Sequence, residues 1–156
     1  MNRHRGFSLT ELVTVLAIMG VLVAVSFPSF TYLSRTTQVK SASSNIYLAL
    51  LKARSEAVKR NGNVTLTPIS GKFENGWTMT DFNGVVLSSQ EALKGVRVNS
   101  SITTNLIYSA NGRIQGGASP YFWVQQPSTD QRVFISRCVT VSPNGSPYVK
   151  TDTACP

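Results

Sequence analysis

The sequence has few of the side chains that catalysis requires. Of its 156 residues, one is a histidine, His4, and seven are aspartate or glutamate. His4 lies ahead of a long apolar run, and the carboxylates show neither the spacing of a general acid–base pair nor that of metal ligands. We therefore expect no catalytic residue, no cofactor and no metal, and an enzyme is excluded from the functions considered.

The sequence also lacks internal repeats, low-complexity tracts and signs of a second domain. A chain of this length can form one domain with a modest core and one appended element. Cysteine is scarce, since only Cys138 and Cys155 are present. We expect these two to form a disulfide if this part of the chain lies outside the cytoplasm.

One long apolar run is the strongest feature that the sequence does contain. Residues 12–27 carry no charge. As a helix, residues 7–27 would be about 32 Å long, close to the roughly 30 Å hydrocarbon core of a bilayer. No A-x-A site follows the run and Glu11 interrupts its start, so it does not fit a secretory signal peptide. A membrane-spanning helix fits, with the basic residues 3–5 in the cytoplasm and the chain after Pro28 on the other side.

Glu11 stands out because a carboxylate near the start of a membrane helix is unfavourable unless a cation neutralises it. Gly6, Phe7, Glu11 and the apolar run together resemble the type III signal of type IV pilins and type II secretion pseudopilins. The resemblance implies that a prepilin peptidase cleaves after Gly6 and methylates Phe7. It also implies that Glu11 pairs with the N-terminal amine of a neighbouring subunit during assembly.

After Pro28 the chain changes from apolar on all sides to amphipathic. Lysines and serines face one side, Glu56 can pair with Arg60, and Asn61-Gly62 is typical of a helix C-terminus. One long helix is therefore predicted over residues 7–60. Its apolar side chains, spaced three and four apart, form one stripe that we expect to be buried: Val39, Ala42, Ile46, Leu50, Ala53 and Ala57.

Short alternating or β-branched runs separated by turn residues follow Gly62. Asn-Gly and Gly-Gly pairs mark several of the turns, which favours antiparallel hairpins packed on the helix. The predicted fold class is α+β. We expect strands over residues 63–67, 76–80, 85–88, 96–99, 105–109, 121–125, 132–141 and 148–151.

Three segments of the second half resemble the GspH/FimT group of minor pilins and pseudopilins. They are residues 53–61, residues 76–84 with Gly76-Trp77 and Asp81, and residues 108–113, which read YSANGR. The resemblance implies a long helix cradled by two small antiparallel sheets. In this interpretation Trp77 and Trp123 are core residues and not base-stacking aromatics.

The combined pattern predicts three parts of the chain. Residues 1–6 are a cleaved leader, and residues 7–30 are the transmembrane and assembly half of the helix. Residues 31–156 are a periplasmic head, with the amphipathic helix at 31–61 and the β region at 63–156. We expect a bacterial inner-membrane protein with a single span that is incorporated into a pilus or pseudopilus.

The head is basic. From Arg35 onward there are thirteen Lys or Arg and six Asp or Glu, a balance of 13 − 6 = +7. Such a balance suits nucleic acid or anionic lipid, or simply a solvated surface. Some FimT proteins bind DNA through a C-terminal Gly-Arg-x-Arg motif, but the equivalent stretch here, residues 145–150, lacks the first arginine. A DNA-binding patch would have to consist of Arg113, Arg132, Arg137 and Lys150, with Tyr148 stacking on a base.

The preferred function is a minor pilin that helps to initiate or cap assembly of a type IV pilus. The alternatives are a type II secretion system pseudopilin and a DNA-binding minor pilin that acts in DNA uptake. The expected partners are other pilins or pseudopilins through the N-terminal helix, the prepilin peptidase, the inner membrane and, in the last alternative, DNA.

Cleavage between Gly6 and Phe7 can be tested by intact-mass analysis of the protein extracted from membranes. The expected mass lacks the first six residues and carries one added methyl group. A mature chain that begins at Met1, or after Phe27, would contradict the prediction.

Overall fold

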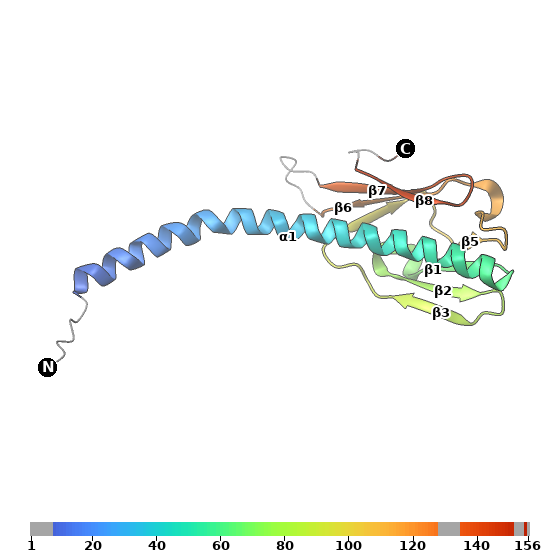
Figure 1. Ribbon diagram of the computed structural model, residues 1–156, viewed down its shortest axis with the longest axis horizontal. Coiled ribbons are helices and arrows are strands. Elements are labelled where there is room, and N and C mark those ends of the chain that lie inside the picture. Colours follow the sequence, from blue (N-terminus) through green and yellow to red (C-terminus); the bar gives the residue numbers. More distant parts are fainter. Residues whose placement is uncertain (1–7, 128–134, 152–154, 156) are drawn as a thin grey trace. The chain divides into compact units, whose positions relative to one another are not determined.

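The computed structural model describes residues 8–127, 135–151 and 155, and the backbone alone for residues 25–31. The chain divides into two units, Met1–Ser34 and Arg35–Pro156. Helix α1 (Leu9–Arg60) begins in the first unit and ends in the second (Figure 1). Each unit is described below by itself.

The first unit contains the N-terminal part of α1. The side chains from Leu9 to Ala24 are all exposed. Among the residues that the structure describes, no helix has both the length and the apolar character needed to cross a membrane.

The second unit, called the head from here on, places α1 against two four-stranded antiparallel sheets (Figure 1). The strand order is β3-β2-β1-β5 in the first sheet and β4-β6-β7-β8 in the second. The first sheet consists of β1 (Val64–Pro68), β2 (Trp77–Asp81), β3 (Val86–Gln90) and β5 (Leu106–Tyr108). The second consists of β4 (Arg97–Ser100), β6 (Tyr121–Gln125), β7 (Ser136–Val141) and β8 (Pro147–Lys150).

These elements confirm the α+β fold class. Each predicted run overlaps one strand. The run at 121–125 has the observed bounds, and most other ends differ by one or two residues. In the run at 132–141 the strand begins at Ser136, and residues 132–134 lie outside the described residues. The α1 helix ends at Arg60, as predicted. Asn61 adopts the left-handed conformation with φ 49°, and the N–H of Gly62 donates to the carbonyl of Ala57 at 3.1 Å, which is a Schellman-type C-cap.

The core lies where the buried stripe of α1 meets the two sheets. All six side chains predicted to form that stripe are buried, and Ala42, Ala53 and Ala57 let the sheets approach the helix closely. Both sheets contribute to one cluster, with Leu66, Met79 and Tyr108 from the first sheet and Phe122, Val124 and Val139 from the second. Trp77 belongs to this core as predicted, whereas Trp123 is only half-buried.

A disulfide fixes the C-terminal end of the chain. Cys138 on β7 is fully buried and is bonded to Cys155, with 5.5 Å between the two Cα atoms. The structure therefore contains the disulfide that the sequence predicts. The pair closes a loop with a sequence separation of 17 that includes the whole of β8.

Removing this disulfide should destabilise the head measurably. In the chain-entropy account, a loop of this size contributes about 3 kcal/mol. A Cys138→Ala, Cys155→Ala double variant is expected to lose roughly that much free energy of unfolding in urea titrations. Free-thiol labelling of the denatured, unreduced wild type should find neither cysteine reactive, and labelling of both would contradict the bond.

Candidate functional site

The N-terminal site begins at Ser8, since Gly6 and Phe7 lie outside the described residues. The Ser8 hydroxyl accepts a hydrogen bond from the backbone N–H of Glu11 at 3.2 Å. Ser8 is therefore the N-cap of α1, and Glu11 is the third residue of the first turn. Sequence reasoning assigned no role to Ser8, although Ser-x-x-Glu ahead of an apolar run is the sequence pattern of a capping box.

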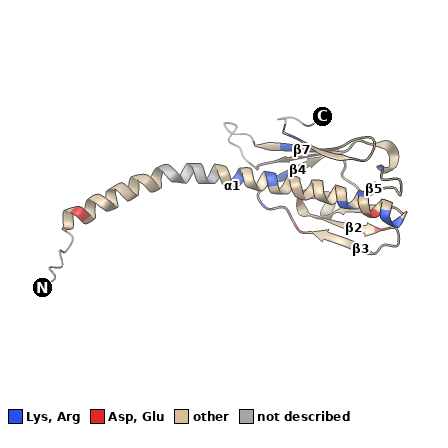
Figure 2. Cartoon of the chain, in the orientation of Figure 1, with Lys and Arg blue, Asp and Glu red and all other residues tan. Residues whose placement is uncertain are grey.

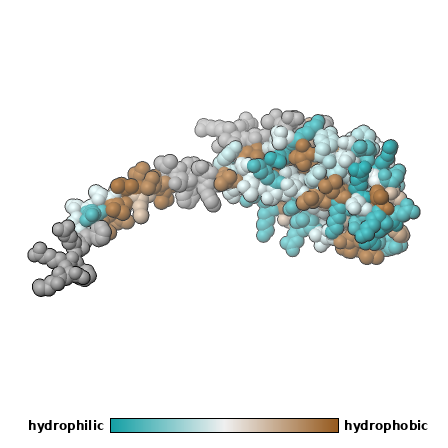
Figure 3. All heavy atoms as spheres, in the orientation of Figure 1, coloured by the Kyte–Doolittle hydropathy of each residue, from teal (hydrophilic) through white to brown (hydrophobic). Residues whose placement is uncertain are grey.

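Among residues 8–34, the part of the first unit that the structure describes, Glu11 is the one charged residue. Its side chain is exposed, and Figure 2 shows it as the one acidic residue near the start of α1. The described residues that follow are mostly hydrophobic (Figure 3). A carboxylate in the first helical turn interacts favourably with the helix dipole and still offers acceptor atoms to a cation on another molecule.

Among the described residues, the cations predicted to bind DNA are Arg113, Arg137 and Lys150, and they do not form one patch. Cys138 pairs with Lys150 and Thr140 with Tyr148, so Lys150 and Tyr148 share one face of the second sheet. Lys150 lies over the Tyr148 ring, with Nζ 5.7 Å from the ring centroid. Arg137 precedes Cys138 on β7 and therefore points to the opposite face.

Arg113, the remaining predicted cation that the structure describes, is also separate from Lys150. Arg113 lies beside Gly145, in the turn that precedes β8, whereas Lys150 is at the other end of that strand. Arg132 lies outside the described residues. The structure thus places Tyr148 and Lys150 together and separates both from Arg137 and Arg113.

The turn between β7 and β8 contacts residues from two of the segments that resemble the GspH/FimT group, residues 53–61 and 108–113. Arg54 on α1 donates from Nη1 to the Ser146 hydroxyl at 3.1 Å and from Nη2 to the Asn144 carbonyl at 3.2 Å. The Tyr108 hydroxyl donates to the Gly145 carbonyl at 3.2 Å. Burial raises the pKa of Tyr108 well above its ordinary value, against the opposing effect of the Arg54 charge, so this hydroxyl remains a donor at neutral pH.

A close backbone approach explains the glycine in this turn. Gly145 has a φ of 82°, and a Cβ there would overlap the carbonyl oxygen of Gly112 in the YSANGR segment. Sequence reasoning did not connect Arg54 with this turn, because the partners are 90 and 92 residues apart and nothing local signals the contact. The YSANGR segment therefore acts as a packing element between α1 and the second sheet.

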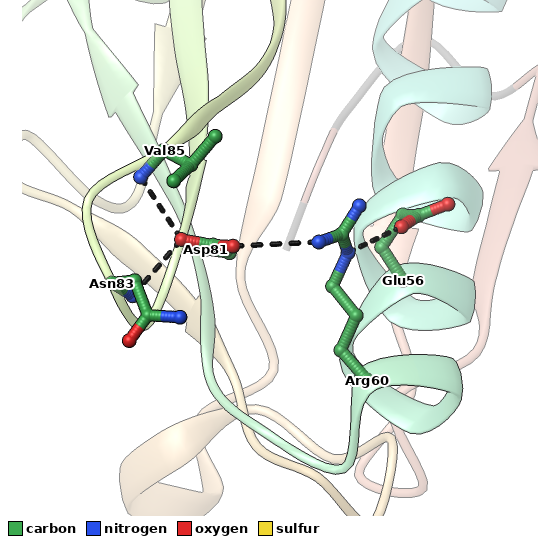
Figure 4. Close-up of polar contacts among 5 residues, drawn as sticks. All are labelled: Glu56, Arg60, Asp81, Asn83 and Val85. Atoms are coloured by element: carbon green, nitrogen blue, oxygen red, sulfur yellow. Dashed lines mark hydrogen bonds and ion pairs between the residues drawn. The ribbon is translucent and has the colours of Figure 1, made fainter.

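A second polar cluster joins the end of α1 to the hairpin between β2 and β3 (Figure 4). The Asp81 side chain is 3% exposed, and one of its oxygens accepts from the N–H groups of Asn83 and Val85, both at 2.9 Å. Its other oxygen lies 3.4 Å from Nη1 of Arg60. Arg60 also donates from Nε to Glu56 at 2.7 Å, as the sequence predicts. That hydrogen bond lowers the pKa of Glu56 despite partial desolvation.

The two units carry the features of pilin-like subunits, namely an N-terminal helix with an acidic first turn and a head of one helix on two antiparallel sheets. Residues 1–27 match the prokaryotic N-terminal methylation motif. Residues 42–145, more than half of the chain, match the family described as type II transport protein GspH. The chain belongs to the GspH family.

Known relatives agree with this assignment. Two fimbrial proteins of Pseudomonas aeruginosa are each 32% identical over 81 residues, and the chain spans about half the length of these curated relatives. The fold resembles the type IV minor pilin FimU of P. aeruginosa, with a TM-score of 0.62, 17% identity and coverage of 74% of this chain and 89% of FimU. It also resembles the minor pseudopilin EpsH of the Vibrio cholerae type 2 secretion system, with a TM-score of 0.57, 12% identity and coverage of 73% and 97%.

Loss of the Asp81 carboxylate should destabilise the head. In Asp81→Ala, two N–H groups and the Arg60 guanidinium lose a buried acceptor, so we expect the free energy of unfolding to fall by about 3 kcal/mol. Glu56→Gln is the matched control, since Glu56 belongs to the same cluster but is more exposed. Urea titration should show a small change for the control, and equal losses in both variants would contradict the assigned role of Asp81.

Proposed function

We propose that this chain is a minor pilin that enters a type IV pilus through its N-terminal helix and helps to initiate or cap assembly. The observation that carries the proposal is the presence in one chain of the methylation motif and a GspH-family head, with Glu11 exposed in the first turn of α1. The similarity to fimbrial proteins and to FimU supports a pilus over other filaments.

The proposed path to the filament follows from the N-terminal residues. A prepilin peptidase removes residues 1–6 and methylates the amine of Phe7, while the apolar part of α1 holds the subunit in the inner membrane with the head in the periplasm. The amine of a neighbouring subunit then binds the Glu11 carboxylate. Because an ion pair is strongly favoured in a medium of low dielectric constant, this contact would select the axial position of each new subunit.

A type II secretion pseudopilin is the second candidate, supported by the GspH family match and the likeness to EpsH. Both systems use the same kind of N-terminal signal, so Glu11 does not separate them. Recovery of the chain from sheared surface pili, and its loss when pilus assembly genes are deleted, would support the pilus. Loss of protein secretion with normal pili would support the pseudopilus. The separation of Arg113, Arg137 and Lys150 in the described part of the head gives no support to a DNA-binding role, so DNA uptake is not proposed.

The proposed role of Glu11 predicts a specific assembly defect. Glu11→Ala should remove the subunit from sheared filaments, because no carboxylate is left to bind the incoming amine. Glu11→Asp, which keeps the charge on a shorter side chain, should retain part of the incorporation. Quantitative immunoblots of filament and membrane fractions measure both variants.

The melting temperature of the head should be the same in both Glu11 variants, since Glu11 belongs to the other unit. Normal incorporation of Glu11→Ala would exclude the assembly role.

A further inference from the structure

The hairpin between β2 and β3 exposes three apolar side chains that lie close together in the sequence. Phe82, Val85 and Val86 are 58%, 55% and 60% exposed, respectively. Single exposed hydrophobic residues are ordinary, but three of them on one hairpin suit an interaction surface. Figure 3 shows hydrophobic atoms at the lower margin of the head, where β3 lies in Figure 1. We call Phe82, Val85 and Val86 the hairpin patch.

The hairpin patch is held in a fixed conformation. Asp81 accepts hydrogen bonds from the N–H groups of Asn83 and Val85 and contacts Arg60, which ties the hairpin to α1 (Figure 4). Phe82 rests against the end of the helix, because a Cβ at Gly62 would overlap its ring. A surface fixed in this way loses little conformational entropy when a partner binds it.

The charges near the hairpin patch are arranged with cations outward. The Asp81 carboxylate is buried, with a side chain 3% exposed, and Glu56, which is 19% exposed, is paired with Arg60. Arg60 is 39% exposed and Lys59 is exposed. The chain from Arg35 onward carries the balance of +7. A second copy of this chain would bring like charges together, so electrostatic complementarity favours an acidic partner.

DNA is also acidic but fits this surface less well than a protein does. Two of the three side chains in the patch are valines, which offer DNA neither a stacking face nor a hydrogen-bond donor.

We propose that the hairpin patch is the docking surface for the head of a different pilin-class subunit, one with an apolar spot surrounded by carboxylates. This inference rests on the proposed function. Among the described strands, β3 lies at the edge of its sheet and pairs with β2 alone. Its free backbone groups lie next to the patch and can add hydrogen bonds to the apolar contact.

The test uses the full-length chain in its native cells and measures its amount in sheared filaments. A Val85→Ser, Val86→Ser double variant should be incorporated at least about tenfold less than wild type, since buried apolar side chains near the centre of an interface dominate its affinity. Leu48→Ser and Val149→Ser are matched controls, because both remove an exposed apolar side chain elsewhere on the head. Undiminished incorporation of the double variant would overturn the proposal.

The sign of the partner's charge has its own test. Val86→Lys should reduce incorporation less than Val86→Glu, because an acidic partner attracts the lysine and repels the glutamate. An equal or opposite order would overturn the acidic partner. Melting temperatures show whether each variant is folded. If the Val85→Ser, Val86→Ser double variant does not fold, Val86→Lys and Val86→Glu test the docking surface in its place.

Failure of the proposed function is recognised separately, because the wild-type chain would then be missing from the filaments. In that case a photo-crosslinking amino acid at Val86 of the full-length chain, irradiated in native membranes, tests the docking surface directly. An adduct with an acidic protein that carries the same type of N-terminal signal supports the proposal. An adduct with a second copy or with any other protein, or no adduct, overturns it.

Discussion

The burial of one narrow stripe of α1 against two sheets is the constraint on which the rest of the head depends. Alanines at positions 42, 53 and 57 bring both sheets close to the helix axis, and the larger side chains between them fill the space that remains. A larger residue at any of these alanines would separate a sheet from the helix. The polar contacts of Arg54 and Arg60 reach their partners only because the helix lies this close.

Much of the fold could be predicted because its signals are local. The three- and four-residue spacing of the stripe, the turn glycines and the Asn61-Gly62 cap each report the backbone conformation of their own neighbourhood. Relations between distant segments could not be predicted in this way. One example is the register of β7 with β8, which places the side chains of Arg137 and Lys150 on opposite faces. The contact of Arg54 with Ser146 also depends on the assembled fold, which no window of the sequence contains.

The two units distribute their charges in contrasting ways. In the described part of the first unit, the acidic residue is Glu11, with its carboxylate exposed in an otherwise apolar segment. In the head, by contrast, the carboxylates of Asp81 and Glu74 accept hydrogen bonds from backbone N–H groups of the same head. These two carboxylates therefore contribute to folding, and the exposed charge near them is mainly basic, as at Lys59, Arg60 and Lys72.

The way α1 is packed has a mechanical consequence. Within the head, a force that pulls α1 along its own axis acts on every contact between the helix and the sheets. Because the buried stripe extends from Val39 to Ala57 and touches both sheets, the helix can slide out only if all of these contacts yield in shear at once. The other end of the chain cannot peel away strand by strand either, since the bond between Cys138 and Cys155 locks β8 within a closed loop. The architecture is therefore suited to carrying tension.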